Sequence, residues 1–107
     1  MKAIIHGKRF DTDKATLIGE AGSGGYALLP HGSSQWWNGG LYRTPQSGRF
    51  FLAGKGGSMT IFARFKGDNA QADRIIEMTK QEALEWAEVN LTAEVIEAAF
   101  ADMIEDA

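Results

Sequence analysis

Residues 41–53, LYRTPQSGRFFLA, carry the strongest structural pattern in the chain. Two segments rich in aromatic and aliphatic side chains, 41–44 and 49–53, flank the sequence Pro45-Gln46-Ser47-Gly48. Aromatic residues are enriched in strands, proline presets φ at the start of a turn, and glycine is favoured at its end. We therefore predict two antiparallel strands joined by a tight turn.

Further strands are predicted on both sides of this hairpin. Residues 2–5 and 8–10 form a second hairpin around His6-Gly7, because glycine readily takes the positive φ that a two-residue turn demands. Residues 60–65 and 74–78 also have the composition of strands. Together these segments predict an antiparallel sheet of three to five strands.

Asp11-Thr12-Asp13 predicts the start of a short N-terminal helix. Carboxylates are favoured near the positive end of the helix dipole, where they also cap free amide groups. The apolar side chains within residues 15–18 would pack this helix against the sheet, and Gly19 or Gly22 would end it.

Two more helices are predicted in the C-terminal part. Thr79 and Glu82 have the spacing of a capping box, in which each side chain accepts a hydrogen bond from the other residue's backbone N–H. This helix runs to about Val89 and is broken by Asn90. Thr92 caps a final helix, whose core-facing stripe comprises Ile96, Ala99, Phe100, Met103 and Ile104. The prediction is an α+β fold, a single domain over residues 1–107, with this helix pair covering one sheet face.

The composition limits the possible classes of protein. Of the 107 residues 44% are hydrophobic and 23% are charged, which is ordinary for one globular domain. The chain has no cysteine, which excludes disulfides, a thiolate nucleophile and cysteine metal sites. No apolar run approaches the roughly 18 residues of a membrane helix, and the N-terminal apolar stretch is too short for a signal peptide. We expect a cytoplasmic protein without a membrane partner.

Charge is distributed very unevenly along the chain. Up to Gly67 there are nine lysines and arginines against three carboxylates, and from Asp68 onward there are two against eleven, giving +6 and −9. The helical periodicity predicts acidic ridges facing solvent, with candidate partner-binding residues Glu82, Glu85, Glu88, Glu94, Glu97 and Glu105. Simple solvation of helix faces would produce the same pattern.

Catalytic and ligand-binding motifs are missing from the sequence. Residues 54–58, GKGGS, resemble a phosphate-binding loop, but Ala53 stands where that motif requires its second glycine, so we predict a glycine turn between strands. His6 and His31 are the only histidines and lack metal-ligand spacing. We therefore expect no catalytic residue, no metal site and no cofactor, in a protein that is not an enzyme.

Aromatic and basic residues interleave in the β region. Trp36, Trp37 and Arg43 belong to this set, which could form a stacking platform for single-stranded nucleic acid. Alternation along strands would instead place half of the aromatic rings in the core. Because Trp36 and Trp37 are adjacent, they face opposite sides in a strand, and an exposed ring beside Arg43 could anchor a partner.

Several segments resemble a family of small proteins carried by phages, plasmids and other bacterial mobile elements. The resemblance covers most of the chain outside residues 19–35 and rests on residues 1–13 (MKAIIHGKRFDTD), 41–44 (LYRT), 51–54 (FLAG), Gly56-Gly57 and 82–88 (EALEWAE). The chain departs from the family pattern at His6, where asparagine is expected, and in a longer glycine-rich insert. The shared motifs are structural and carry no active-site residue.

Proteins of this general type include inhibitors of CRISPR–Cas systems. The resemblance implies an anti-CRISPR protein of the bacterial cytoplasm that binds an effector complex, a type I Cascade in preference to Cas9. Effector channels are positively charged, so the acidic helices would block target DNA by mimicking it. No direct nucleic-acid partner is expected, because the net charge is −3. The alternatives are a nucleic-acid-binding accessory protein that uses the basic β half, and a structural or maintenance protein of the element.

Overall fold

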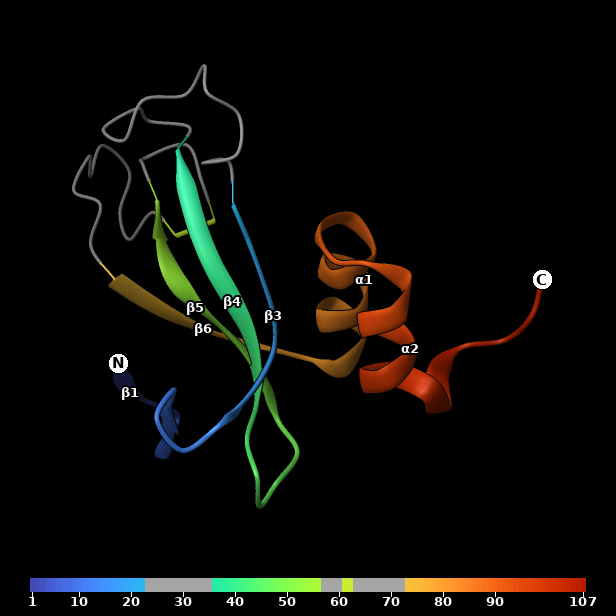
Figure 1. Cartoon of the computed structure of the whole chain (residues 1–107). Coiled ribbons are helices and arrows are strands. Elements are labelled where there is room, and N and C mark those ends of the chain that lie inside the picture. The colour runs from blue at the N-terminus through green and yellow to red at the C-terminus, as the bar shows by residue number, and fades with distance from the viewer. Residues whose placement is uncertain (23–35, 57–60, 63–72) are drawn as a thin grey trace.

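The computed structural model describes residues 1–22, 36–56, 61–62 and 73–107 (Figure 1). Within these ranges the secondary structure is, in chain order, β1 (Lys2–Ile5), β2 (Lys8–Asp11), β3 (Thr16–Gly22), β4 (Trp37–Arg43), β5 (Phe50–Gly56), β6 (Asp73–Met78), α1 (Lys80–Asn90), α2 (Ala93–Phe100) and a 3-10 turn, η2 (Ala101–Met103).

Strands β3 to β6 form a four-stranded antiparallel sheet in the order β3-β4-β5-β6. The β4–β5 hairpin predicted from residues 41–53 is confirmed, with Leu41 opposite Leu52. In its turn the Gly48 N–H donates to the Thr44 carbonyl over 3.1 Å, and Gly48 has a φ of +63°. Glycine takes this left-handed conformation without steric cost, as the pattern requires.

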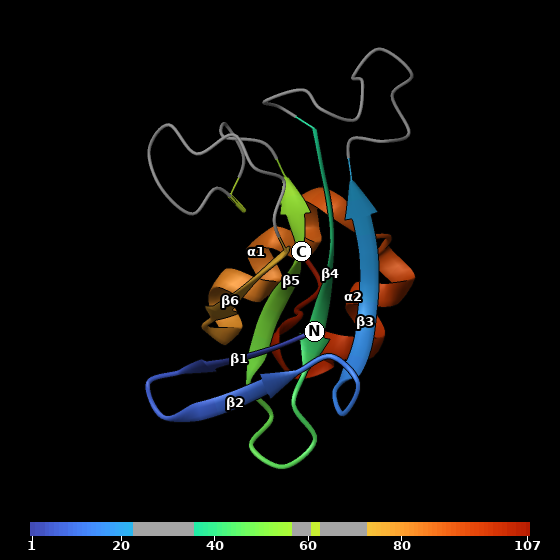
Figure 2. The same cartoon turned by 90° about the vertical axis from the view of Figure 1, so that its left-hand side faces the viewer.

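The predicted β1–β2 hairpin is confirmed, but it forms a separate two-stranded sheet, so the prediction of one sheet is wrong. His6 and Gly7 have φ values of 52° and 76°, the positive pair of a two-residue turn. Figure 2 shows this hairpin in front of the four-stranded sheet and both helices behind it. The described chain therefore has three layers, with the large sheet in the middle.

The N-terminal helix predicted after Asp11 is wrong. Residues 12–15 form turns, and Thr16–Gly22 is strand β3, paired with β4 through a bulge between Leu17 and Gly19. The Asp11 Oδ1 atom accepts the Asp13 N–H over 3.0 Å, so this carboxylate closes a turn instead of capping a helix. The α+β class holds, with two antiparallel sheets and two C-terminal α-helices among the described residues.

Strand β5 is buried on both faces, which explains its continuous apolar sequence. Phe50 and Leu52 belong to the core on the helix side, where Phe50 stacks on Phe100 at 5.2 Å between ring centroids. Phe51 belongs to the core on the hairpin side, where its centroid lies 5.4 Å from that of Phe10. Both cores therefore depend on β5.

The glycine turn predicted for residues 54–58 is replaced by a strand over its first half, since Gly54 and Gly56 end β5. Gly54 pairs with Gly39 of β4, and the buried Phe62 ring lies against both. Because Gly39 and Gly54 have no side chains, there is room for this ring. Ile61 and Phe62, from the predicted strand 60–65, form a turn. Residues 57–60 and 63–65 of the remaining turn and strand predictions lie outside the described residues.

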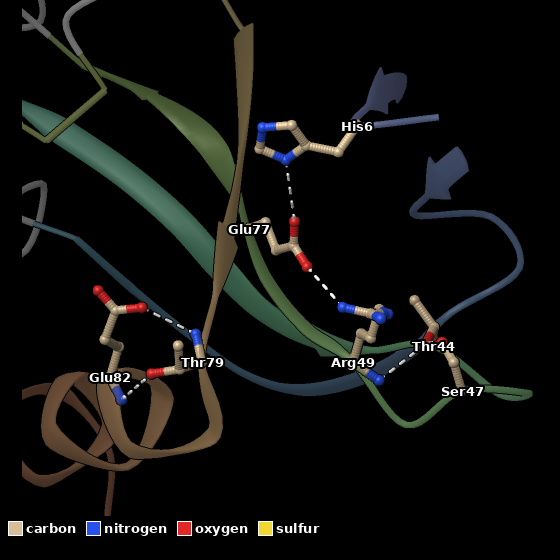
Figure 3. Close-up of polar contacts among 7 residues, drawn as sticks. All are labelled: His6, Thr44, Ser47, Arg49, Glu77, Thr79 and Glu82. Atoms are coloured by element: carbon tan, nitrogen blue, oxygen red, sulfur yellow. Dashed lines mark hydrogen bonds and ion pairs between the residues drawn. The ribbon is translucent and has the colours of Figure 1, made fainter. Parts of the chain in front are cut away.

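The capping box at the start of α1 is confirmed. The Glu82 N–H donates to Thr79 Oγ1 over 3.1 Å, and the Thr79 N–H donates to Glu82 Oε1 over 2.8 Å (Figure 3). Thr92 caps α2 through the Val95 N–H. The predicted extension of the last helix through Ile104 is wrong, because Phe100 has a φ of −127° and α2 ends there.

Candidate functional site

Five glutamates of α1 and α2 are exposed to solvent. Glu82, Glu85 and Glu88 are exposed on α1, and Glu94 and Glu97 are exposed on α2, which packs against α1. The buried residues of the two helices, Ala83, Leu84, Ala87 and Phe100, face the sheet. We call these five glutamates the helical acidic face.

Two of the five carboxylates also have local partners. Glu82 Oε1 is used in the capping box, and Glu85 Oε1 accepts a hydrogen bond from Gln81 over 3.2 Å. Glu88, Glu94 and Glu97 make no hydrogen bond or ion pair with another described side chain. A partner would therefore meet three uncommitted carboxylates and two that are already oriented.

Glu105 differs from the other predicted site residues. Since α2 ends at Phe100 and η2 at Met103, Glu105 lies beyond both helices, in the exposed C-terminal segment. The neighbouring Asp102 is held to α1 by an ion pair with Lys80. The hydrogen bond from Lys80 holds the pKa of the Asp102 carboxyl below its ordinary value. This pair fastens η2 to the start of α1.

The predicted Trp36, Trp37 and Arg43 set is split by the fold. Trp36 is buried, and Trp37 is half-buried in contact with two rings, at 6.1 Å from Phe62 and 6.2 Å from Trp86. Both indoles pack within the structure, so neither presents an exposed ring as an anchor. Arg43 is exposed and lines a hollow with Thr16 and Lys80.

Four cationic side chains gather on the opposite side of the β4–β5 turn. Lys8, Arg9, Lys14 and Arg49 line one hollow, together with residues of that turn. Arg49 is partly neutralised, because its Nη1 donates to Glu77 Oε2 over 3.0 Å (Figure 3). The Nδ1 atom of the exposed His6 lies 4.0 Å from the other oxygen of Glu77. These cations come from three separate segments, so spacing along the chain does not reveal their proximity.

A third hollow lies on the hairpin side of the sheet, above Gly22, Gly40 and Gly54. Tyr42 lines it and stacks on Phe51 at 5.3 Å between ring centroids. Burial, with the nearby carboxylates of Glu20 and Asp13, raises the pKa of Tyr42 above its ordinary value. The phenol is thus neutral at physiological pH.

Comparison of the chain with protein-family models, curated proteins and solved structures finds no match. The resemblance to mobile-element proteins therefore stays a prediction from the sequence. Among the described residues, no group of histidines and carboxylates is placed to hold a metal ion. No helix within the described ranges is long and apolar enough to cross a membrane.

Proposed function

We propose that this protein inhibits a CRISPR effector complex in the bacterial cytoplasm by occupying its nucleic-acid channel. A type I Cascade is the effector we favour. The observation that carries the proposal is the helical acidic face, which presents five exposed glutamates on two helices that pack on the same side of the sheet. The choice of a CRISPR effector as the partner comes from the resemblance to mobile-element proteins.

The charge of the helical acidic face is complementary to that of an effector channel. Effector complexes hold their nucleic acid in positively charged channels. An acidic surface fixed on two packed helices meets such a channel without rearrangement, and opposite fields accelerate encounter. Glu82 can contribute while it caps α1, because the capping box uses only its Oε1 atom. Blocking then depends on occupancy of the channel and needs no chemical step.

Charge reversal on α1 tests this proposal. The double variant Glu85→Lys, Glu88→Lys changes two exposed residues and keeps good helix formers at both positions. We expect association with the effector to slow by at least about tenfold and to lose salt sensitivity, because electrostatic steering acts mainly on the association rate. Stopped-flow binding to a purified effector measures this rate.

A matched control separates location from total charge. Glu20→Lys with Asp106→Lys makes the same change in net charge at two exposed residues outside the helical acidic face. This control should associate at close to the parental rate. If the α1 variant keeps its helical circular dichroism, binds at the parental rate and still inhibits, the helical acidic face is not the recognition surface.

A further inference from the structure

The hollow between the β1–β2 hairpin and the β4–β5 turn has the features of an anion site. Its volume is about 450 Å³, within the usual range of ligand clefts. The lining includes four cationic side chains, from Lys8, Arg9, Lys14 and Arg49, and one carboxylate, from Asp11. We call it the basic hollow.

Three of these cations have no ion-pair partner among the described residues. Lys8, Arg9 and Lys14 are exposed and form no ion pair with any described residue, whereas Arg49 is paired with Glu77. The Asp11 carboxylate is engaged locally, since its Oδ1 accepts the Asp13 N–H over 3.0 Å. Like charges gathered around one hollow repel one another, and a bound anion relieves that repulsion.

The rim formed by the β4–β5 turn is held in place by hydrogen bonds. Thr44 Oγ1 lies 2.9 Å from Ser47 Oγ and accepts the Arg49 N–H over 2.9 Å (Figure 3). Both hydroxyls belong to lining residues. Arginine offers a planar fork that matches phosphate oxygens, and lysines add point charges, so this donor set suits phosphate groups.

We propose that the basic hollow binds the phosphate backbone of a single-stranded nucleic acid. A single strand repeats its charge at every nucleotide and is flexible enough to follow cations spread around a hollow. The aromatic residue in the lining, Phe10, is 1% exposed and cannot stack with bases. Contacts to phosphate and sugar alone do not distinguish sequences.

The net charge of −3, which led us to expect no nucleic-acid partner, is not the charge that a strand meets at the basic hollow. The helical acidic face and the hairpin lie on opposite faces of the sheet (Figure 2). Both sets of charges are exposed to solvent, where screening at physiological ionic strength acts over about 8 Å. The cations that line the basic hollow therefore contribute more to its local field than the glutamates on the far side of the sheet. The proposal is also independent of effector inhibition, because it concerns the isolated protein.

The test uses oligothymidylate of about twelve nucleotides, within the usual range of single-strand site sizes. Fluorescence anisotropy at increasing salt should give a slope of log K against log[salt] between about −2 and −3, since each neutralised phosphate contributes about −0.7. A mixed-sequence strand should bind equally well. Backbone NMR shifts should change in residues 8–15 and 44–49. Absence of binding at low salt would overturn the proposal.

Paired lysine variants locate the site. Lys8→Gln with Lys14→Gln removes two lining cations, and Lys2→Gln with Lys55→Gln makes the same chemical change outside the lining. The first pair should weaken binding at low salt by about tenfold and flatten the salt slope by about 1.4, and the second should leave the slope unchanged. Equal effects of the two pairs would refute a local site.

Two competing ligands distinguish the sources of negative charge. Polyglutamate of matched length should bind at least about tenfold more weakly than the oligonucleotide, because each carboxylate sits on a flexible side chain that must be ordered on binding, whereas the phosphates are part of the nucleic-acid backbone itself. Equal affinity would assign the hollow to acidic peptides and overturn the proposal. Saturation by inorganic phosphate without any binding of the oligonucleotide would also overturn it.

Discussion

Glycines in β4 and β5 determine how closely these two central strands approach each other. A Cβ atom added at Gly54 would lie 2.2 Å from the Asn38 carbonyl oxygen and 2.5 Å from the Gly39 Cα. Both neighbours are backbone atoms of a paired strand, which cannot move aside alone. At Gly40 the nearest atoms, at 3.0 and 3.1 Å, belong to the side chains of Leu17 and Tyr42.

This difference predicts unequal effects of two neighbouring alanine substitutions. Gly54→Ala should lower the free energy of unfolding by about 1–3 kcal/mol, because it overpacks a rigid site. Gly40→Ala should cost clearly less, since the exposed Leu17 side chain can rotate away. Urea denaturation of both variants measures the effect, and equal losses would argue against strand contact at Gly54.

Two local predictions were wrong because the same residue types serve more than one backbone structure. Aspartate is favoured both in tight turns and at helix N-termini. Asp11 and Asp13 therefore predicted a helix at the point where the chain in fact turns into β3. The glycines at 54 and 56 suggested a turn, but they belong to strand β5. Phe62, the ring that packs on Gly54, lies eight positions further along the chain, so this contact could not be predicted from neighbouring residues. Neither outcome is encoded by neighbours alone.

At the scale of elements, the fully buried residue of α2 is one large side chain, Phe100. Phe100 is 0% exposed and stacks on Phe50. Phe100→Ala should lower the free energy of unfolding by about 3–5 kcal/mol through lost burial and a cavity. Val89→Ala, at a position 82% exposed, should change it by less than about 0.5 kcal/mol. A loss below about 1 kcal/mol for Phe100→Ala would mean that the helix is not docked in solution.

Elements whose turn or cap residues lie within the element itself were predictable from the sequence. Element boundaries that depend on packing against distant residues were not. Residues 41–53 and the Thr79–Glu82 box contain their own turn and cap chemistry, and both form as predicted. The stripe of α2 gave no sign that the helix ends at Phe100, where η2 begins. Of the predicted stripe, Phe100 is buried, Ile96 and Met103 are half-buried, and Ile104 is exposed.

At the scale of the whole molecule, folding sorts the charges onto two sides of one sheet. The helical acidic face was predictable, because its residues are close in sequence and follow helical spacing. The basic hollow was not, because Lys14 and Arg49 are brought together only by the order β3-β4-β5 and the position of the hairpin. Net charge averages the two sides and describes neither.

Separate faces lead to a final prediction about stoichiometry. If the helical acidic face blocks an effector by occupancy, target binding should fall linearly with added protein and reach zero near one equivalent per channel. The breakpoint is measured by titrating the protein into an effector whose concentration is well above the dissociation constant of the protein–effector complex. The Lys8→Gln, Lys14→Gln variant should keep the same breakpoint, because its changes lie across the sheet from the helices. Complete inhibition far below one equivalent would instead require turnover, and would contradict a mechanism based on occupancy.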